Sequence, residues 1–208
     1  MQRNIAWMLA LSILVLLPAC GSKEQAPEPA AAPEPVVEEE APLAAVAVLK
    51  PRADNEVSGT ITFTEVEGGV EVVADIARVS PGLHGIHLHE KGDCSAEDFT
   101  STGGHFNPTD APHGGPDDAV RHAGDFGNIE IGEDGVGRLR LVTDMLTVAD
   151  GPNTVVGRAV ILHEGEDDLE SQPTGAAGGR LACAIVRLAG EEWVEEVDEP
   201  ESEPGLEG

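Results

Sequence analysis

Six of the seven histidines in this chain, together with one aspartate, are spaced as metal ligands. They are His87, His89, His105, His113, His122, Asp125 and His163. In a strand, successive side chains point to opposite faces, so His87 and His89 project to the same side. Neutral imidazole binds zinc and copper, and a carboxylate can complete a tetrahedral zinc shell. Seven donors exceed the need of one metal, so the pattern predicts two metal sites that share one ligand.

The alternative for any single histidine is a hydrogen-bonded core or surface residue, and for one histidine alone we would prefer it. Several of these histidines, however, lie in one stretch rich in glycine and proline, which favours a metal site. His84 is the exception. A lone histidine three residues before His87 is more often a buried, hydrogen-bonded residue than a ligand, so we expect His84 to be structural.

The first 19 residues predict a secretory signal peptide. Arg3 is followed by an apolar run at residues 5–17, which is too short to span a bilayer. The ending LPAC at residues 17–20 resembles the lipobox of bacterial lipoproteins, in which the cysteine becomes the acylated first residue. A plain signal peptide with an incidental cysteine is the alternative. The resemblance implies a lipid anchor at Cys20 in the periplasm of a bacterial cell envelope, and Gly21 favours the outer membrane over the inner one.

Two segments beside the domain have compositions that cannot bury a core. Residues 20–42 consist mainly of alanine, proline and glutamate and predict a disordered tether. Residues 191–208 carry nine acidic residues and no lysine or arginine, and predict a disordered acidic tail. The remaining domain, residues 43–190, has 24 acidic and 10 basic residues, which give a net charge of −14. This charge excludes nucleic acids and anionic membrane surfaces as partners of the domain.

The segment of residues 43–190 is long enough to form one hydrophobic core, and it shows few helix signals. Short alternating segments divided by turn residues predict eight strands, at residues 43–50, 57–66, 69–80, 82–90, 127–132, 135–144, 155–163 and 180–189. The glycine-containing turns at residues 67–69 and 133–135 predict two hairpins. Eight such strands predict an all-β fold, either an antiparallel sandwich or a flattened barrel.

Two long connections, at residues 92–124 and 164–179, interrupt the strand pattern. Connections of this length are uncommon in compact domains unless they are functional or restrained. The first contains one cysteine and three histidines, so a disulfide and a metal are the expected restraints. With Cys20 acylated, Cys94 and Cys183 remain as a pair that an exported protein can oxidise, and two free thiols are the alternative. Their bridge would stabilise the fold by about 4 to 5 kcal/mol.

Six sequence motifs, in this order and at these separations, resemble the copper,zinc superoxide dismutase family. They are GLHGIHLHEKGDC, GGHFNP, HGGP, RHAGDFGN, GRAVILHEGEDDL and TGAAGGRLAC. The resemblance covers about residues 43–189, and the combination is far more specific than a single His-x-His pair. It implies an eight-stranded antiparallel Greek-key barrel with two long functional loops, and an enzyme that converts superoxide to oxygen and hydrogen peroxide.

The resemblance also implies a role for each candidate residue. The implied copper ligands are His87, His89, His105 and His163, and the implied zinc ligands are His105, His113, His122 and Asp125. His105 would bridge the two metals and take part in proton transfer. The other implied roles are a carboxylate link between His87 and His113 for Asp167, anion binding for Arg180, the channel mouth for Thr174, and a disulfide for Cys94 and Cys183.

Two departures from the family pattern affect what the resemblance implies. The second long loop is shorter than in animal members and lacks their lysines, and Pro173 precedes Thr174. Attraction of superoxide is therefore assigned to Arg180 and the copper charge, since repulsion by the acidic domain is screened beyond about 8 Å. The spacing from Cys94 to His105 resembles bacterial members, whereas HFNP and HGGP resemble eukaryotic ones, so a homodimer is left open.

Two other functions fit parts of the pattern. A non-catalytic periplasmic module that binds or buffers copper and zinc on the same fold would need the ligands, but it would not need Arg180 or Asp167. A structural domain held together by zinc alone would leave His87, His89 and His163 unexplained. Because Arg180 and Asp167 are both present, the sequence favours the enzyme.

Overall fold

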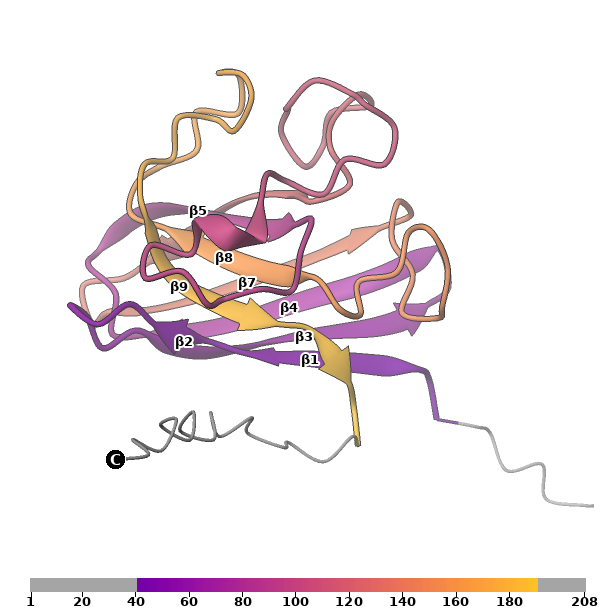
Figure 1. Cartoon of the computed structure of the whole chain (residues 1–208), viewed down its shortest axis with the longest axis horizontal. Helices are drawn as coiled ribbons and strands as arrows, with labels where there is room; N and C mark the ends of the chain where they lie inside the picture. Colours follow the sequence, from indigo (N-terminus) through magenta and orange to yellow (C-terminus); the bar gives the residue numbers. More distant parts are fainter. Residues whose placement is uncertain (1–40, 191–208) are drawn as a thin grey trace, which may run out of the picture. The chain divides into compact units, whose positions relative to one another are not determined.

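Ten β-strands, paired antiparallel throughout, form the framework of residues 41–190, the part of the chain that the computed structural model describes (Figure 1). The strands are β1 (Ala44–Val48), β2 (Lys50–Pro51), β3 (Ser58–Val66), β4 (Gly69–Ala77), β5 (Gly82–His89), β6 (Asp125–Ile131), β7 (Val136–Thr143), β8 (Ala159–His163), β9 (Arg180–Ile185) and β10 (Arg187–Leu188). Within the described residues, the only helical element is the short 3-10 turn η1 (Thr100–Thr102). Among these same residues, no helix has the length and apolar character needed to cross a membrane.

The predictions for the signal peptide, Cys20 and the acidic tail concern residues 1–40 and 191–208, which lie outside the described residues. Most of the predicted tether lies there as well.

The strands follow the order β10-β1-β3-β4-β7-β6-β5-β8-β9-β2 across the sheet. β3 and β4 form a hairpin, and β6 and β7 pair next to their connecting turn, at the two turns predicted from glycine. β4 lies beside β7 rather than beside β5, and the chain passes from β5 through β6 to β7, as in a Greek key. The predicted all-β antiparallel fold is therefore confirmed.

The first and last predicted strands each change partner at one residue, and these two breaks close the sheet into a barrel. β1 pairs with β3, and after Leu49 the chain continues as β2, which pairs with β9. β9 pairs with β8, and after Val186 the chain continues as β10, which pairs with β1. Each of the two predicted strands pairs with different neighbours along its length, so each is divided into two pieces.

The prediction of a strand over residues 155–163 is wrong at its start, because β8 begins only at Ala159. Residues 155–158 form a turn in which Arg158 N donates to the carbonyl of Val155 at 3.2 Å. Gly157, with a φ of 79°, takes the left-handed conformation that glycine tolerates best. Val155 and Val156 are apolar because they pack against the barrel core, although they belong to a turn rather than to a strand.

The barrel core is built from alternating side chains. β4 follows this rule, with every second residue buried in the cluster that fills the barrel. β5 and β8 depart from it, since all of β8 and the last six residues of β5 are buried. Their second faces lie on the side from which both long connections rise (Figure 1).

The outer face of β5 carries the predicted ligands of this strand. His87 lies opposite Ile161 of β8, and His89 lies opposite Ala159. Directly opposed residues share one face of a sheet. Ile161 and Ala159 belong to a small apolar cluster with Phe99, separate from the main core. His87 and His89 therefore point outward from the barrel, toward the long connections.

A disulfide fixes the first long connection to the barrel. Cys94 and Cys183 are joined by an S–S bond of 1.93 Å, with their Cα atoms 5.9 Å apart. Cys183 is a buried residue of β9 that lies opposite Ile161 of β8. The predicted disulfide is confirmed, and it ties the beginning of the loop to the strand next to β8.

Candidate metal centre

Two groups of ligand-type side chains lie side by side on the outer face of β5. The first contains His87, His89, His105 and His163, and the second contains His105, His113, His122 and Asp125. Within each group the candidate ligand atoms all lie within 4.8 Å of one another, and every residue is buried. The structure thus brings together all seven predicted ligands, and His105 belongs to both groups.

The barrel positions most of the first group. His87 and His89 lie on one face of β5, and His163 is the last residue of β8, the neighbouring strand. His105 comes from the first long connection, where it forms an isolated bridge pair with His89. The next residue, Phe106, donates its N–H to the carbonyl of Leu88 at 2.7 Å. Backbone pairing with β5 therefore fixes a histidine that is distant in sequence.

One nitrogen of each ring in the first group faces an acceptor. The pairs are His89 Nδ1 with Gly103 O (3.0 Å), His163 Nδ1 with Gly178 O (3.3 Å), His87 Nε2 with Asp167 Oδ2 (2.7 Å) and His105 Nδ1 with Asp125 Oδ1 (2.8 Å). The opposite nitrogens are buried and have no hydrogen-bond partner among residues 41–190. A buried polar atom left unpaired is costly. Four such imidazole nitrogens in one group are a donor set that fits copper.

Asp125 lies at the centre of the second group. Its Oδ1 lies 2.8 Å from His105 Nδ1, 3.0 Å from His113 Nδ1 and 3.1 Å from His122 Nδ1. Its Oδ2 accepts hydrogen bonds from the backbone N–H groups of His122 (2.9 Å) and Gly114 (3.2 Å). The group therefore offers three imidazole nitrogens and one carboxylate oxygen, which fits a four-coordinate zinc site.

His105 joins the two groups through opposite sides of its ring. Its Nδ1 faces Asp125, and its Nε2 is the buried nitrogen without a partner among the described residues. The ring also stacks on that of His87, with the ring centroids 3.9 Å apart. This geometry is that of one imidazole shared between two metal sites.

Asp167 links the two groups through their outer nitrogens. Its Oδ2 accepts from His87 Nε2 at 2.7 Å, and its Oδ1 accepts from His113 Nε2 at 3.0 Å and from the backbone N–H of Leu169 at 2.7 Å. Two hydrogen bonds of 2.8 Å with the side chain of Asn128 hold the backbone of Asp167. Such outer hydrogen bonds fix the orientation and the tautomer of a ligand ring.

Gly175 leaves the space that this link needs. A Cβ atom at position 175 would overlap Asp167 Oδ1 and lie 2.7 Å from His113 Nε2. The backbone there has a φ of +67°, which side chains other than glycine adopt only with strain. Both steric and backbone requirements therefore select glycine beside the carboxylate.

Electrostatics differ between the two groups. Burial lowers the pKa of His105 to about 4 and that of His163 to about 3, and it also lowers the pKa values of His87 and His89. Burial also acts on His113, but neighbouring carboxylates outweigh it and raise the pKa to about 9. Because metals bind neutral imidazole, the first group is ready for a metal at neutral pH, whereas a metal must displace a proton from His113.

Comparison with known proteins agrees with this site. A family profile described as copper/zinc superoxide dismutase (SODC) matches residues 57–186. The chain belongs to the copper/zinc superoxide dismutase family. The resemblance inferred from the sequence motifs is confirmed, and copper and zinc are the metals of this family.

A solved structure of the clock protein EA4 is similar to this superoxide dismutase family member. The two share 44% sequence identity and superpose with a TM-score of 0.64, and the match covers 71% of this chain and 95% of the other. The name of that relative describes a clock protein and states no enzymatic activity. Similarity to it supports the family and the fold, and the activity has to be argued from the site.

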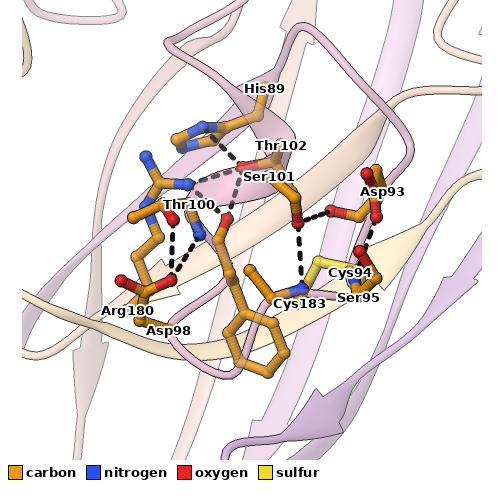
Figure 2. Close-up of a disulfide and its surroundings, with 12 residues drawn as sticks. His89, Asp93, Cys94, Ser95, Asp98, Thr100, Ser101, Thr102, Arg180 and Cys183 are labelled. Carbon is orange, nitrogen blue, oxygen red and sulfur yellow. Dashed lines mark hydrogen bonds between the residues drawn. A yellow bond between two sulfur atoms is a disulfide. The ribbon is translucent and has the colours of Figure 1, made fainter.

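Arg180 lies beside the first histidine group of this superoxide dismutase family member. It begins β9 and lies opposite His163 in the sheet. Figure 2 shows its guanidinium beside His89 and the loop that the disulfide holds. The guanidinium donates hydrogen bonds to Phe99 O (2.5 Å), Thr102 Oγ1 (2.6 Å) and Gly103 O (2.9 Å). Burial is the main cause that lowers the pKa values of His89 and His163, and the positive charge of Arg180 lowers them further.

Two further predicted residues have distinct places. His84 lies outside both groups, and its ring nitrogens lie 2.9 Å from the carbonyl of His163 and 2.9 Å from that of Ser80. It therefore connects the start of β5 to the end of β8, as expected for a structural histidine. Thr174 is partly buried and precedes Gly175 in the second long connection.

Apart from Asp167, the sequence reasoning did not find the groups that orient the ligands. They are the carbonyls of Gly103 and Gly178 and the side chains of Asn128 and Gln172. A backbone carbonyl has no sequence signature, because every residue carries one. The repeated glycines of the two loops were the only available signal, and they indicate close approach of the backbone rather than a particular acceptor.

Proposed function

We propose that this protein is a superoxide dismutase, which converts two superoxide anions and two protons to one oxygen and one hydrogen peroxide. The observation that carries the proposal is a half-buried arginine, Arg180, beside a group of four histidines whose free nitrogens converge. When bound by these histidines, copper supplies the one-electron redox couple, and zinc at the second group adds a fixed positive charge. The chain itself must bind the anion, hold the rings in place and manage a proton.

Arg180 is suited to bind the anion because part of its guanidinium is free. Both Nη1–H groups and one Nη2–H group donate to oxygens of residues 99–103. Among the described residues, the other two N–H groups have no hydrogen-bond partner. An arginine that is held by three hydrogen bonds and retains two donors can receive a small anion by charge and hydrogen bonding together.

His105 is the group best placed to hold a proton during peroxide formation. Its Nε2 is buried and without a partner among residues 41–190, while its Nδ1 is held by Asp125. Of the four histidines in the first group, His105 alone also belongs to the second, so its Nδ1 would stay held there while its Nε2 takes a proton. We therefore assign the proton-holding role to His105 Nε2, since imidazole is the side chain best matched to proton transfer near neutral pH.

The acidic character of the domain does not prevent the approach of an anion. Exposed charges are screened beyond about 8 Å at physiological ionic strength, so the local sign at the entrance decides. Asp98 is the acidic group whose charge acts on Arg180. Its carboxylate is held by the backbone N–H (3.0 Å) and hydroxyl (2.7 Å) of Thr100. The charges of Arg180 and the bound metals oppose it at the site.

A non-catalytic copper and zinc binding module is the second candidate, and the clock protein EA4 among the relatives gives a specific reason to test it. The experiment loads the purified domain with copper and zinc, verifies both metals, and follows superoxide decay directly. An enzyme accelerates the decay far beyond the same amount of copper in a chelate with no free coordination position. Full metal content with no acceleration would leave the binding module as the function.

We also propose that Cys20 carries a lipid that anchors the domain in the periplasm, with the outer membrane favoured by Gly21. Support comes from the LPAC ending and from the tether composition of residues 20–42. The test compares membrane fractions of the full chain with those of Cys20→Ser. The protein is expected to move to the soluble periplasmic fraction in the variant, and unchanged membrane association would refute the anchor.

Gel filtration of the released domain tests whether it forms a homodimer.

A further inference from the structure

We propose that Gln172 is a positioning residue that couples the second long connection, residues 164–179, to the second ligand group, which contains His113. The proposal rests on the proposed function, because it concerns how this chain shapes the entrance to the copper side. The connection carries Asp167, Thr174 and Gly175, and Gly178 supplies the acceptor for His163. What holds the middle of this loop therefore affects both metal groups.

The side-chain amide of Gln172 uses all of its hydrogen-bonding groups except one lone pair. Its Oε1 accepts the backbone N–H of His113 at 2.8 Å, and its Nε2 donates to the carbonyl of His113 at 2.9 Å. The same Nε2 donates to the carbonyl of Glu170 at 3.1 Å. The first two bonds imitate a pair of strand hydrogen bonds between a side chain and a backbone. An amide with both donors and its oxygen engaged is fixed in one orientation.

His113 is therefore held twice by the same loop. Gln172 holds its backbone, and Asp167 accepts from its ring Nε2 at 3.0 Å. Gly175 packs closely against this second contact. The remaining ring nitrogen, Nδ1, is left to face Asp125. Fixing both the backbone and the outer ring nitrogen determines where Nδ1 points, and this is the atom that His113 offers to zinc.

Within the described residues, Gln172 provides the only hydrogen bonds between residues 170–174 and the rest of the domain. The other hydrogen bonds of this stretch stay inside the loop, such as those from Ser171 to Asp168 (2.8 and 2.5 Å) and from Gly175 N to Ser171 O (2.7 Å). The ends of the loop have their own attachments, for example Asn128 to Asp167. The middle depends on one side chain.

The anchor at Gln172 lies close to the residue expected to line the entrance. Thr174 lies two residues after Gln172, with only Pro173 between them. Thr174, which the family resemblance places at the channel mouth, should therefore take its position from that anchor. Zinc binding at His113 and the placement of the loop around Thr174 should therefore stabilise each other, since any group that favours the ordered loop also favours the ordered ligand.

The test uses the copper- and zinc-loaded protein and three variants. Gln172→Met keeps the length of the side chain but removes its hydrogen bonds, and Gln172→Ala removes both. Ser171→Ala is the matched control, because Ser171 Oγ bonds only to Asp168 in the same loop. Zinc affinity is measured by competition with a chromogenic chelator, and amide hydrogen exchange is followed over residues 164–179.

The expected result is a loss of zinc affinity of about tenfold in both Gln172 variants, the size seen when an outer contact of a metal ligand is removed. Exchange of residues 170–176 should quicken in these variants, and Ser171→Ala should match the parent in both measurements. Zinc affinity of Gln172→Met within twofold of the parent, or unchanged exchange, would overturn the proposal. Neither measurement uses superoxide, so failure of the dismutase assignment would leave this result independent.

Discussion

Replacing Asp167 with asparagine should weaken copper binding while leaving zinc binding nearly intact. Oδ1 of Asp167 accepts two hydrogen bonds, from His113 Nε2 (3.0 Å) and from Leu169 N (2.7 Å), whereas Oδ2 accepts one, from His87 Nε2 (2.7 Å). The asparagine oxygen should therefore take the Oδ1 position, and its NH₂ group should face His87. The NH₂ group of the asparagine and the N–H at His87 Nε2 would then face each other as two donors. The His87 ring avoids this only by carrying its proton on Nδ1, the nitrogen that is otherwise free for copper.

The size of the effect follows from burial. Removing an outer hydrogen bond of a metal ligand weakens metal affinity by about 10- to 100-fold, or roughly 1.4 to 2.8 kcal/mol. The side chains of Asp167 and His87 are both 0% exposed, so water cannot replace the lost acceptor. We therefore expect the copper affinity of Asp167→Asn to fall toward the upper end of this range, and the zinc affinity to change by less than about threefold.

Competition with a copper chelator on zinc-loaded protein, and with a zinc chelator on copper-loaded protein, measures the two affinities separately. Asp168→Asn is the control, because the exposed Asp168 carboxylate accepts only from Glu170 N and from Ser171 N and Oγ. A fall in zinc affinity equal to or larger than the fall in copper affinity would refute the argument from the orientation of the amide. Unchanged copper affinity would refute the role assigned to the His87 proton.

Three other predictions concern the anion site, the loop and the ionisation of the histidines. Arg180→Ala should lower the rate constant for superoxide decay by about 10- to 100-fold and flatten its dependence on salt, with both metals retained; a salt dependence equal to the parent's would contradict the anion role. Gly175→Ala should lower the free energy of unfolding in urea by about 2 kcal/mol or more. Gly68→Ala, at a position with a φ of +94° but no atom near the added Cβ, should lower it by only about 1 kcal/mol, and equal losses would contradict the steric argument. Metal-free protein should lose stability as the pH falls from about 6.5 toward 3, because burial sets the pKa values of His105 and His163 at about 4 and about 3 and the unfolded chain binds more protons in this window. A flat urea midpoint between pH 7 and 4 would count against that burial.

The parts of the site that depend on regular structure could be predicted from the sequence. Two histidines separated by one residue share a face only if the stretch is a strand, and the glycine-bounded alternation around His87 and His89 made that assignment secure. The same reasoning failed at residues 155–158, where two adjacent valines suggest a strand but Gly157 turns the chain. Burial pattern alone does not distinguish a buried turn from the beginning of a strand.

The parts that depend on loops could not be derived from local patterns. The placement of His105 against β5 comes from a bridge pair with His89, and no periodicity predicts the partner of a residue in a 33-residue connection. The family motifs supplied that assignment instead. Gln172 was not found at all, because an exposed glutamine in a polar loop has no distinguishing signal until its backbone partner, His113, is known.

The exchange of partners between the two terminal strands has a consequence for when the molecule can assemble. Lys50 of β2 pairs with Cys183, and Ala45 of β1 pairs with Leu188, so the first strands of the domain cannot complete their pairing until the last strands are present. Pairings between residues so distant in the chain slow folding, because the entropy of closing the long loop is lost before the contacts form. β9 also carries Arg180 and the second disulfide cysteine. A chain emerging from its amino end would thus remain open, without anion site or disulfide, until nearly all of the domain has appeared.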